Sequence, residues 1–163
     1  MSVFDSVFAS TLAIEGGYSN NPADPGGETM WGVTKRVAVA NGYTGPMASM
    51  PQSVASAIAK KVYWDPYQCD QLPPAISLQV FDVAYNGGAA GKWLQQALGV
   101  TVDGVIGAQT IAAARAANPW KVVAIFNSLR LEYYTSLGNT WPTFGKGWTR
   151  RVAANLMKGD FHG

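Results

Sequence analysis

The chain has 163 residues, of which 48% are hydrophobic and 13% are charged. This composition can bury a core, so it excludes an intrinsically disordered protein. Its apolar runs are shorter than the ~20 residues that a membrane-spanning helix needs, so stable membrane insertion is not expected. The net charge of +2 comes from basic residues spread along the chain. Proteins that bind nucleic acid usually gather their basic residues into one patch, so nucleic acid is not an expected partner either.

The counts of cysteine and histidine limit the chemistry further. Cys69 and His162 are the only residues of their types. They exclude an internal disulfide, a zinc site of cysteines and histidines and, unless His162 reaches into a site, a Ser-His-Asp triad. The sequence also lacks a phosphate-binding glycine loop followed by Lys-Ser or Lys-Thr, so no metal or other cofactor is expected. Acid–base chemistry would then use the ten carboxyl groups, tyrosines or lysines.

The first half of the chain is predicted to contain two helices and a short hairpin. Apolar residues recur every three or four positions over residues 2–15, and Ser2 with Asp5 has the spacing of a capping box. Residues 18–34 hold prolines, glycines and an alternating segment, which favours a strand or hairpin. A second helix is predicted over residues 51–64, opened by a proline.

The second half is predicted to be helical, with breaks at glycine and proline. Helices are expected from Pro73-Pro74 to Gly87-Gly88, over 89–97, over 108–117, after an Asn118 cap with Pro119 just inside it, and from about Lys146. Helical stripes predict that Trp93, Trp120 and Trp148 are core residues and that Val122, Phe126, Leu129 and Tyr133 form a buried face. Because there is no low-complexity linker, residues 1–163 are expected to form a single compact unit, mainly α, with a small β-hairpin near its N-terminus.

Glu15 is the residue that physical chemistry favours as a general acid. It follows Phe8 and Leu12 on the apolar stripe of the first predicted helix, so we expect its carboxyl group to be partly desolvated. It also lies at the helix C-terminus, the negative end of the macrodipole. Both effects raise the pKa of a carboxyl group, as proton donation near neutral pH requires. The alternative is an ordinary helix-terminal glutamate that is rotated into solvent.

The segment after Glu15 contains the other groups that cleavage of a glycosidic bond uses. One carboxylic acid protonates the leaving oxygen, and a second group activates water or stabilises the oxocarbenium ion. Asp24 and Thr29 are candidates for the second role, although Asp24 can equally be a turn residue. Tyr18 and Trp31 offer flat aromatic faces to sugar rings.

A second group of candidate binding residues precedes the Gly87-Gly88 break. Tyr85 and Asn86 lie where side chains can reach a cleft, and the Asn86 amide can donate to and accept from an acetamido group. Asn86 can also be read as a helix C-cap. Two carboxylates are given structural readings: Glu28 as a solvated side chain and Asp103 as part of a loop that packs two helices.

The N-terminal motifs closely resemble the signature of the glycoside hydrolase family 108 muramidases. The matching residues are Glu15-Gly16-Gly17-Tyr18, Asp24-Pro25-Gly26-Gly27-Glu28-Thr29 and Gly32-Val33-Thr34. Members of this family are N-acetylmuramidases, found as phage endolysins and in export systems that remodel the cell wall. The resemblance implies a lysozyme-like fold and a catalytic acid role for Glu15. The glutamate–aspartate–threonine order is also similar to that of the phage T4-type lysozymes, although the threonine stands one residue closer here. That similarity implies that Asp24 and Thr29 help to hold the nucleophilic water.

The second half resembles the peptidoglycan-binding segment that accompanies this catalytic region in the family. The resemblance rests on residues 80–88, 94–99 and 102–107. It implies a catalytic segment over 1–88 and a peptidoglycan-binding-like helical segment over 89–163. The expected protein is a monomeric, cofactor-free lysozyme that cleaves the β-1,4 bond between N-acetylmuramic acid and N-acetylglucosamine in bacterial peptidoglycan.

The expected biological setting is a phage or prophage endolysin. Such a protein waits in the host cytoplasm after synthesis and acts on the periplasmic cell wall after its release. A secretion-associated muramidase, a lytic transglycosylase that uses the same glutamate, and a non-catalytic wall-binding module are the alternatives.

Overall fold

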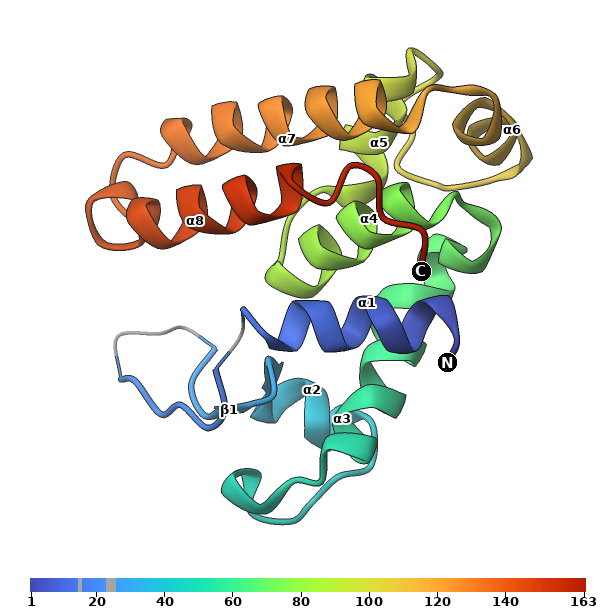
Figure 1. Ribbon diagram of the computed structural model, residues 1–163. Coiled ribbons are helices and arrows are strands. Elements are labelled where there is room, and N and C mark those ends of the chain that lie inside the picture. The colour runs from blue at the N-terminus through green and yellow to red at the C-terminus, as the bar shows by residue number, and fades with distance from the viewer. Residues whose placement is uncertain (15, 23–25) are drawn as a thin grey trace. The chain divides into compact units, whose positions relative to one another are not determined.

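The computed structural model describes residues 1–14, 16–22 and 26–163 (Figure 1). Backbone contacts divide the chain into an N-terminal unit, Met1–Pro66, and a C-terminal unit, Tyr67–Gly163. Helices dominate both units, and the one sheet in the described part of the chain is a two-stranded antiparallel hairpin. The prediction of a mainly α fold with a small hairpin near the N-terminus is confirmed. None of the described helices has the length and apolar character that a membrane span requires.

The N-terminal unit consists of helices around the short hairpin. Its elements are α1 (Val3–Leu12), β1 (Thr29–Met30), β2 (Val33–Thr34), α2 (Lys35–Ala40), a 3₁₀ turn (Met47–Ser49), α3 (Gln52–Ala59) and the π-helical turn that follows it (Lys60–Trp64). The core of this unit includes Phe4, whose ring stacks on Phe8 at 5.7 Å and meets Trp64 edge-on at 5.3 Å between centroids.

The N-terminal cap of α1 agrees with the prediction, whereas its C-terminal boundary does not. The capping box is present: Ser2 Oγ accepts a hydrogen bond from the Asp5 amide at 3.1 Å, and Asp5 Oδ2 accepts one from the Ser2 amide at 2.8 Å. However, the helix ends at Leu12 and does not reach residue 15, so the predicted C-terminal boundary is wrong. The Ile14 amide bonds to the Thr11 carbonyl at 3.0 Å, which tightens the last turn into 3₁₀ geometry and ends the helix early.

The C-terminal unit is built around one helix that is buried over most of its length. Its helices are α4 (Pro74–Asn86), α5 (Ala90–Leu98), α6 (Ala108–Ala116), α7 (Pro119–Ser136) and α8 (Trp141–Leu156); short 3₁₀ turns, Asp65–Tyr67 and Cys69–Gln71, precede them. Every residue of α4 from Ala75 to Tyr85 is buried, because α5 and α7 pack against it. α7 lies alongside α8 in an antiparallel pair (Figure 1).

The start of α8 lies well before the predicted start near Lys146. Pro142 stands in the first turn of the helix, where a missing N–H costs no hydrogen bond. Gly145 looks like a helix breaker in the sequence, but a Cβ at this position would lie 2.6 Å from Cδ2 of Trp141. The glycine is therefore a packing requirement inside the helix.

The core predictions for the tryptophans were right only in part. Trp93 is buried, as predicted. Trp120 is 53% exposed, so its assignment to the core is wrong. It lies in the first turn of α7, at the end of the unit, where the backbone at Gly159 packs against its indole. Trp148 is partly exposed and stacks on Tyr134 at 4.7 Å.

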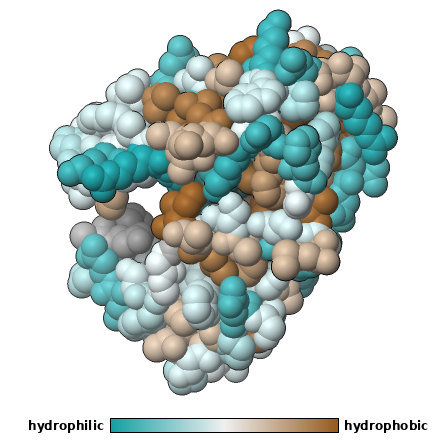
Figure 2. All heavy atoms as spheres, viewed as in Figure 1, coloured by the Kyte–Doolittle hydropathy of each residue, from teal (hydrophilic) through white to brown (hydrophobic). Residues whose placement is uncertain are grey.

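Exposed apolar residues are scattered over the surface. On the face that Figure 2 shows, brown apolar groups alternate with hydrophilic ones. Val39, Val105 and Met157 are among the large apolar side chains that are more than half exposed. Single exposed apolar residues are ordinary on folded proteins, so they do not by themselves indicate an interface.

Candidate functional site

The hairpin presents Trp31 in an unusual backbone conformation. Met30 pairs with Val33, so Trp31 and Gly32 form a two-residue loop, with φ values of 54° and 82°. A type I′ turn requires positive φ at both positions, and a tryptophan rarely adopts it. Nε1 of Trp31 donates a hydrogen bond to the Met50 carbonyl oxygen at 2.9 Å, which fixes the ring. A strained residue with a fixed, partly exposed aromatic ring is typical of a functional position.

A chain of polar contacts runs beside the hairpin. Ser19 pairs with Thr29 through backbone hydrogen bonds, which brings the neighbouring Tyr18 to the strand. The Tyr18 hydroxyl donates to Glu28 Oε1 at 3.1 Å, and Lys35 Nζ lies 3.0 Å from Glu28 Oε2. The Lys35 hydrogen bond lowers the pKa of Glu28, against the opposing effect of desolvation, and Tyr18 adds to the lowering. Glu28 is thus held ionised in an ion pair, which does not suit a proton donor.

The same contacts affect Tyr18. Desolvation, followed by the Glu28 carboxylate, raises the pKa of the Tyr18 phenol. Tyr18 is also exposed, so its neutral ring is accessible at this surface.

Thr29 keeps the capacity to hold a water molecule. Its Oγ1 donates a hydrogen bond to the Gly27 carbonyl oxygen at 3.2 Å, and its side chain is partly exposed. A hydroxyl that donates in this way still has acceptor positions for a water hydrogen. Glu15 and Asp24 lie outside the described residues, so their roles stay predictions.

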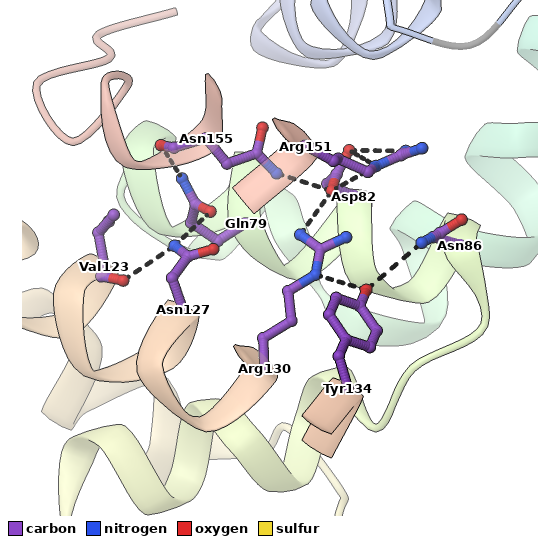
Figure 3. A network of polar contacts seen from close by, with 9 residues as sticks. All are labelled: Gln79, Asp82, Asn86, Val123, Asn127, Arg130, Tyr134, Arg151 and Asn155. Atoms are coloured by element: carbon purple, nitrogen blue, oxygen red, sulfur yellow. Dashed lines mark hydrogen bonds and ion pairs between the residues drawn. The ribbon is translucent and has the colours of Figure 1, made fainter. Parts of the chain in front are cut away.

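A pocket of about 150 Å³ lies where α4 and α7 end, in the C-terminal unit. We call it the helix-end pocket; it is lined by Asn86, Gly87, Gly88, Tyr133, Tyr134, Leu137 and Trp148. Gly87, with φ of 90°, is the C-cap of α4. The alternative reading of Asn86 as the cap is therefore wrong, and its amide points toward Tyr134 (Figure 3).

Behind this pocket, a seam of polar side chains joins three helices (Figure 3). The polar seam comprises Gln79, Asp82 and Asn86 from α4, Asn127, Arg130 and Tyr134 from α7, and Arg151 and Asn155 from α8. Asp82 is 1% exposed and accepts hydrogen bonds from Arg130 Nη1 at 2.8 Å, Arg151 Nη2 at 2.8 Å and Asn155 Nδ2 at 2.7 Å. Two guanidinium groups, from Arg130 and Arg151, share this one carboxylate.

The ion pairs decide the protonation state of Asp82. Desolvation acts to raise the pKa of this carboxyl group, but the charges of Arg151 and Arg130 outweigh it, so the pKa is lowered. Asp82 is thus a buried structural anion. It cannot serve as a proton donor near neutral pH.

Tyr134 connects the polar seam to the helix-end pocket. It is 7% exposed, and its hydroxyl oxygen accepts hydrogen bonds from Arg130 Nε at 2.8 Å and from Asn86 Nδ2 at 3.4 Å. With both lone pairs used, the hydroxyl hydrogen stays available for donation to a further acceptor. Oδ1 of Asn86 accepts no hydrogen bond from the described residues. The pocket therefore offers one donor, one acceptor and the aromatic wall of Trp148, which together suit an acetamido group on a sugar ring.

The structure adds residues to this site that the sequence did not indicate. Tyr85, a predicted substrate contact, is 7% exposed, stacks on Phe81 at 5.2 Å and does not line the pocket. Tyr134 and Trp148 do line it. The prediction that Tyr133 lies on the buried face of α7 is wrong, since it is 43% exposed.

The described residues contain no cluster of three or more His, Cys, Asp or Glu side chains that could hold a metal ion.

Comparisons with known proteins match both halves of the chain. Residues 8–88 match the family model described as Glycosyl hydrolase 108, and residues 89–153 match the model described as Predicted Peptidoglycan domain. Twelve chains of solved structures also match. One of them, described as "Structure of Brucella abortus SagA", is 32% identical with a TM-score of 0.87, over 98% of this chain and 94% of that chain. No curated protein matches.

Proposed function

Because the chain belongs to the glycosyl hydrolase 108 family, we propose that it is an N-acetylmuramidase. It would hydrolyse the β-1,4 bond between N-acetylmuramic acid and N-acetylglucosamine in bacterial peptidoglycan. The observation that carries the proposal is the adjacent pair of matches, a glycosyl hydrolase family over residues 8–88 and a peptidoglycan domain over residues 89–153. The first match supports a glycoside hydrolase with a lysozyme-like fold, and the second supports peptidoglycan as its substrate.

In the proposed reaction, Glu15 donates a proton to the glycosidic oxygen as the bond from that oxygen to C1 breaks. The bonding electron pair goes to the departing oxygen, and a water molecule adds to C1 and gives up a proton. Asp24 and Thr29 orient this water or stabilise the positive charge at C1. Glu28 and Asp82 do not suit the role of proton donor, because the pKa values of both carboxyl groups are lowered.

The described side chains support binding of amino sugars in both units. In the N-terminal unit, Tyr18 and Trp31 supply aromatic faces beside Thr29. In the C-terminal unit, we assign the helix-end pocket to an acetamido group, with Asn86 and Tyr134 as its hydrogen-bonding partners. The Asn86→Ala and Tyr134→Phe variants would then raise KM more than they lower kcat, because each removes a contact made with bound substrate.

The proposal is tested by digesting purified peptidoglycan. The wild-type protein should release reducing ends, and mass spectrometry should show hydrated muramic acid termini. A lytic transglycosylase would give anhydro-muramic products instead, lighter by one water. The Glu15→Gln variant should lose ~10²-fold or more in rate, the lower range for loss of general acid catalysis. Glu132→Gln, the same exchange on an exposed residue of α7, is the matched control and should keep full activity.

We further propose that the protein is a phage or prophage endolysin, held in the host cytoplasm until the membrane is breached. Expression in bacterial cytoplasm should then leave cultures intact until a membrane-permeabilising agent is added, after which the wild type should lyse them. The Glu15→Gln variant should not. Lysis by the wild type without any permeabilising agent would instead favour a protein that is exported to the wall.

A further inference from the structure

A larger pocket, of about 320 Å³, lies at the opposite end of the C-terminal unit. Three prolines, Pro73, Pro74 and Pro119, form its walls together with Trp120 and Phe161. We call it the tail pocket, because residues 159–162 of the C-terminal tail complete it. It is formed where α4 and α7 begin, whereas the helix-end pocket is formed where both helices end. The length of α4 separates the two sites by roughly 18 Å, at 1.5 Å per residue.

The indole of Trp120 is held in this pocket but not buried. A Cβ on Gly159 would lie 2.4 Å from Cε3 of Trp120, so the glycine allows the tail backbone to press against the ring. More than half of the tryptophan nevertheless stays exposed. Trp120 differs from the scattered exposed apolar residues because its ring lines a pocket, where a bound ligand can cover the exposed apolar surface.

The rim of the tail pocket adds polar groups of a particular kind. Asp160 and His162 line it and are both exposed. Within the described residues, neither side chain has a hydrogen bond or an ion pair that the fold uses. A carboxylate accepts hydrogen bonds from hydroxyl and amide hydrogens, and an imidazole can donate or accept. The pocket thus combines a flat apolar wall with a polar rim.

This combination matches a pyranose ring better than a peptide. A hexosamine presents a C–H face that stacks on an indole and an edge of hydroxyl and acetamido groups. A peptide that binds by strand addition needs a strand edge to pair with, and the described part of the C-terminal unit has none. The Asp160 carboxylate also repels the carboxylates of the stem peptide, which N-acetylmuramic acid carries on its lactyl group and N-acetylglucosamine does not.

We infer that the tail pocket is a second carbohydrate site, which binds an N-acetylglucosamine residue of the glycan strand by stacking on Trp120. Only the identity of the ligand rests on the proposed function. The site lies apart from the helix-end pocket, and residues 159–162 fall outside both family matches. Its role is to keep the enzyme on a long glycan and not to take part in bond cleavage.

Direct binding is tested with N,N′-diacetylchitobiose. The indole N–H resonance of Trp120, identified by its absence in Trp120→Phe, should shift saturably when the disaccharide is titrated into the full-length protein. A free peptide stem of peptidoglycan should leave it unchanged. A response to the stem peptide alone, or to neither probe, overturns the inference.

Wall binding is tested by co-sedimentation with intact sacculi, in the Glu15→Gln background so that the wall is not digested. Trp120→Ala should bind about tenfold more weakly, as expected when a central aromatic contact is removed. The double variant Asp160→Ala/His162→Ala, which changes only exposed side chains, should also bind more weakly and decides the question if Trp120→Ala is unstable. Met157→Ala, an exposed apolar residue outside the pocket, is the matched control and should bind normally. Normal binding by both pocket variants overturns the inference.

The two proposals fail separately. A wild-type protein that releases no reducing ends but binds chitobiose at Trp120 refutes the muramidase proposal and leaves the tail pocket assignment intact. A protein that hydrolyses peptidoglycan while chitobiose leaves the Trp120 indole resonance unshifted refutes the tail pocket assignment alone.

Discussion

At the scale of single residues, Asp82 holds together two buried cations. Replacing it with asparagine leaves Arg130, which is fully buried, without its countercharge and removes the ion pair with Arg151. We expect Asp82→Asn to lower the free energy of unfolding by about 3–5 kcal/mol, as is usual when one partner of a buried ion pair is removed. Urea denaturation measures the change. The matched control is Asp65→Asn, which breaks a largely exposed pair with Lys60 and should cost at most about 1 kcal/mol. Equal stability of the two variants would contradict the buried cluster.

The same residue predicts how stability depends on pH. The pKa of Asp82 is lower in the folded chain than its ordinary value of 3.8, so the unfolded chain binds the proton first as the pH falls. The stabilisation from Asp82 is therefore complete above that value and is lost as the pH falls below it toward the folded pKa. Between about pH 5 and pH 3, the wild type should lose stability more steeply than Asp82→Asn. Thermal melts across that range measure the difference, and parallel slopes would show that Asp82 is not the titrating group.

A third residue-scale prediction concerns the stability of Glu15→Gln. A proton donor must stay partly protonated near neutral pH, so ionisation of Glu15 at pH 7 costs folding stability, and a neutral glutamine avoids that cost. The variant should therefore melt no lower than the wild type while it loses activity. Differential scanning calorimetry provides the check. A melting temperature several degrees lower, or full turnover, would make Glu15 a structural residue.

The sequence revealed only one of the two polar partners in the helix-end pocket. Asn86 stands out because a polar residue before two glycines ends an apolar helix. The position of Tyr134 is set by its hydrogen bonds with Arg130 and with Asn86 of α4, and Asn86 lies 48 residues away along the chain. The buried face of α7 also contains Asn127 and Arg130, which a hydrophobic stripe assigns to solvent. Periodicity of apolar residues therefore cannot show a seam that is both buried and polar.

At the scale of elements, two glycines in α8 should respond oppositely to the same substitution. A Cβ at Gly145 would overlap the Trp141 ring, so Gly145→Ala should destabilise the protein by about 1–3 kcal/mol through overpacking. A Cβ at Gly147 meets no atom within 4 Å, so Gly147→Ala should stabilise it by about 0.5–1 kcal/mol, through the better helix propensity of alanine. Chemical denaturation of both variants tests the pair. A gain in stability for both would mean that α8 does not pack around Trp141 as described.

The starts of α7 and α8 show which element boundaries can be predicted from the sequence. The start of α7 follows from local chemistry, since Asn118 accepts a hydrogen bond from the Lys121 amide and Pro119 occupies the first turn. The start of α8 does not, because the contact that requires Gly145 is with the side chain of Trp141. Local signals identified caps and breaks, whereas packing decided which glycines interrupt a helix.

At the scale of the whole molecule, the family boundary and the packing boundary differ. The two family matches meet between residues 88 and 89, whereas backbone contacts divide the chain after Pro66. Helix α4 belongs to the first match but packs on α5 and α7, and its Asp82 pairs with Arg130 and Arg151 from the second. The family boundary between residues 88 and 89 therefore falls inside one of the two packed units.

This difference leads to a prediction about fragments of the chain. A fragment of residues 1–88 carries α4 without the helices that bury it, and Asp82 without either arginine. It should expose the apolar residues of α4, bind hydrophobic dyes and unfold without a cooperative transition. A fragment of residues 67–163 keeps α4 among its partners together with the whole polar seam, so it should melt cooperatively. Calorimetry and dye binding compare the two. If the 1–88 fragment instead melts cooperatively and cleaves peptidoglycan on its own, the catalytic segment is an independent domain, and the buried ion pairs across residue 88 are not needed to fold it.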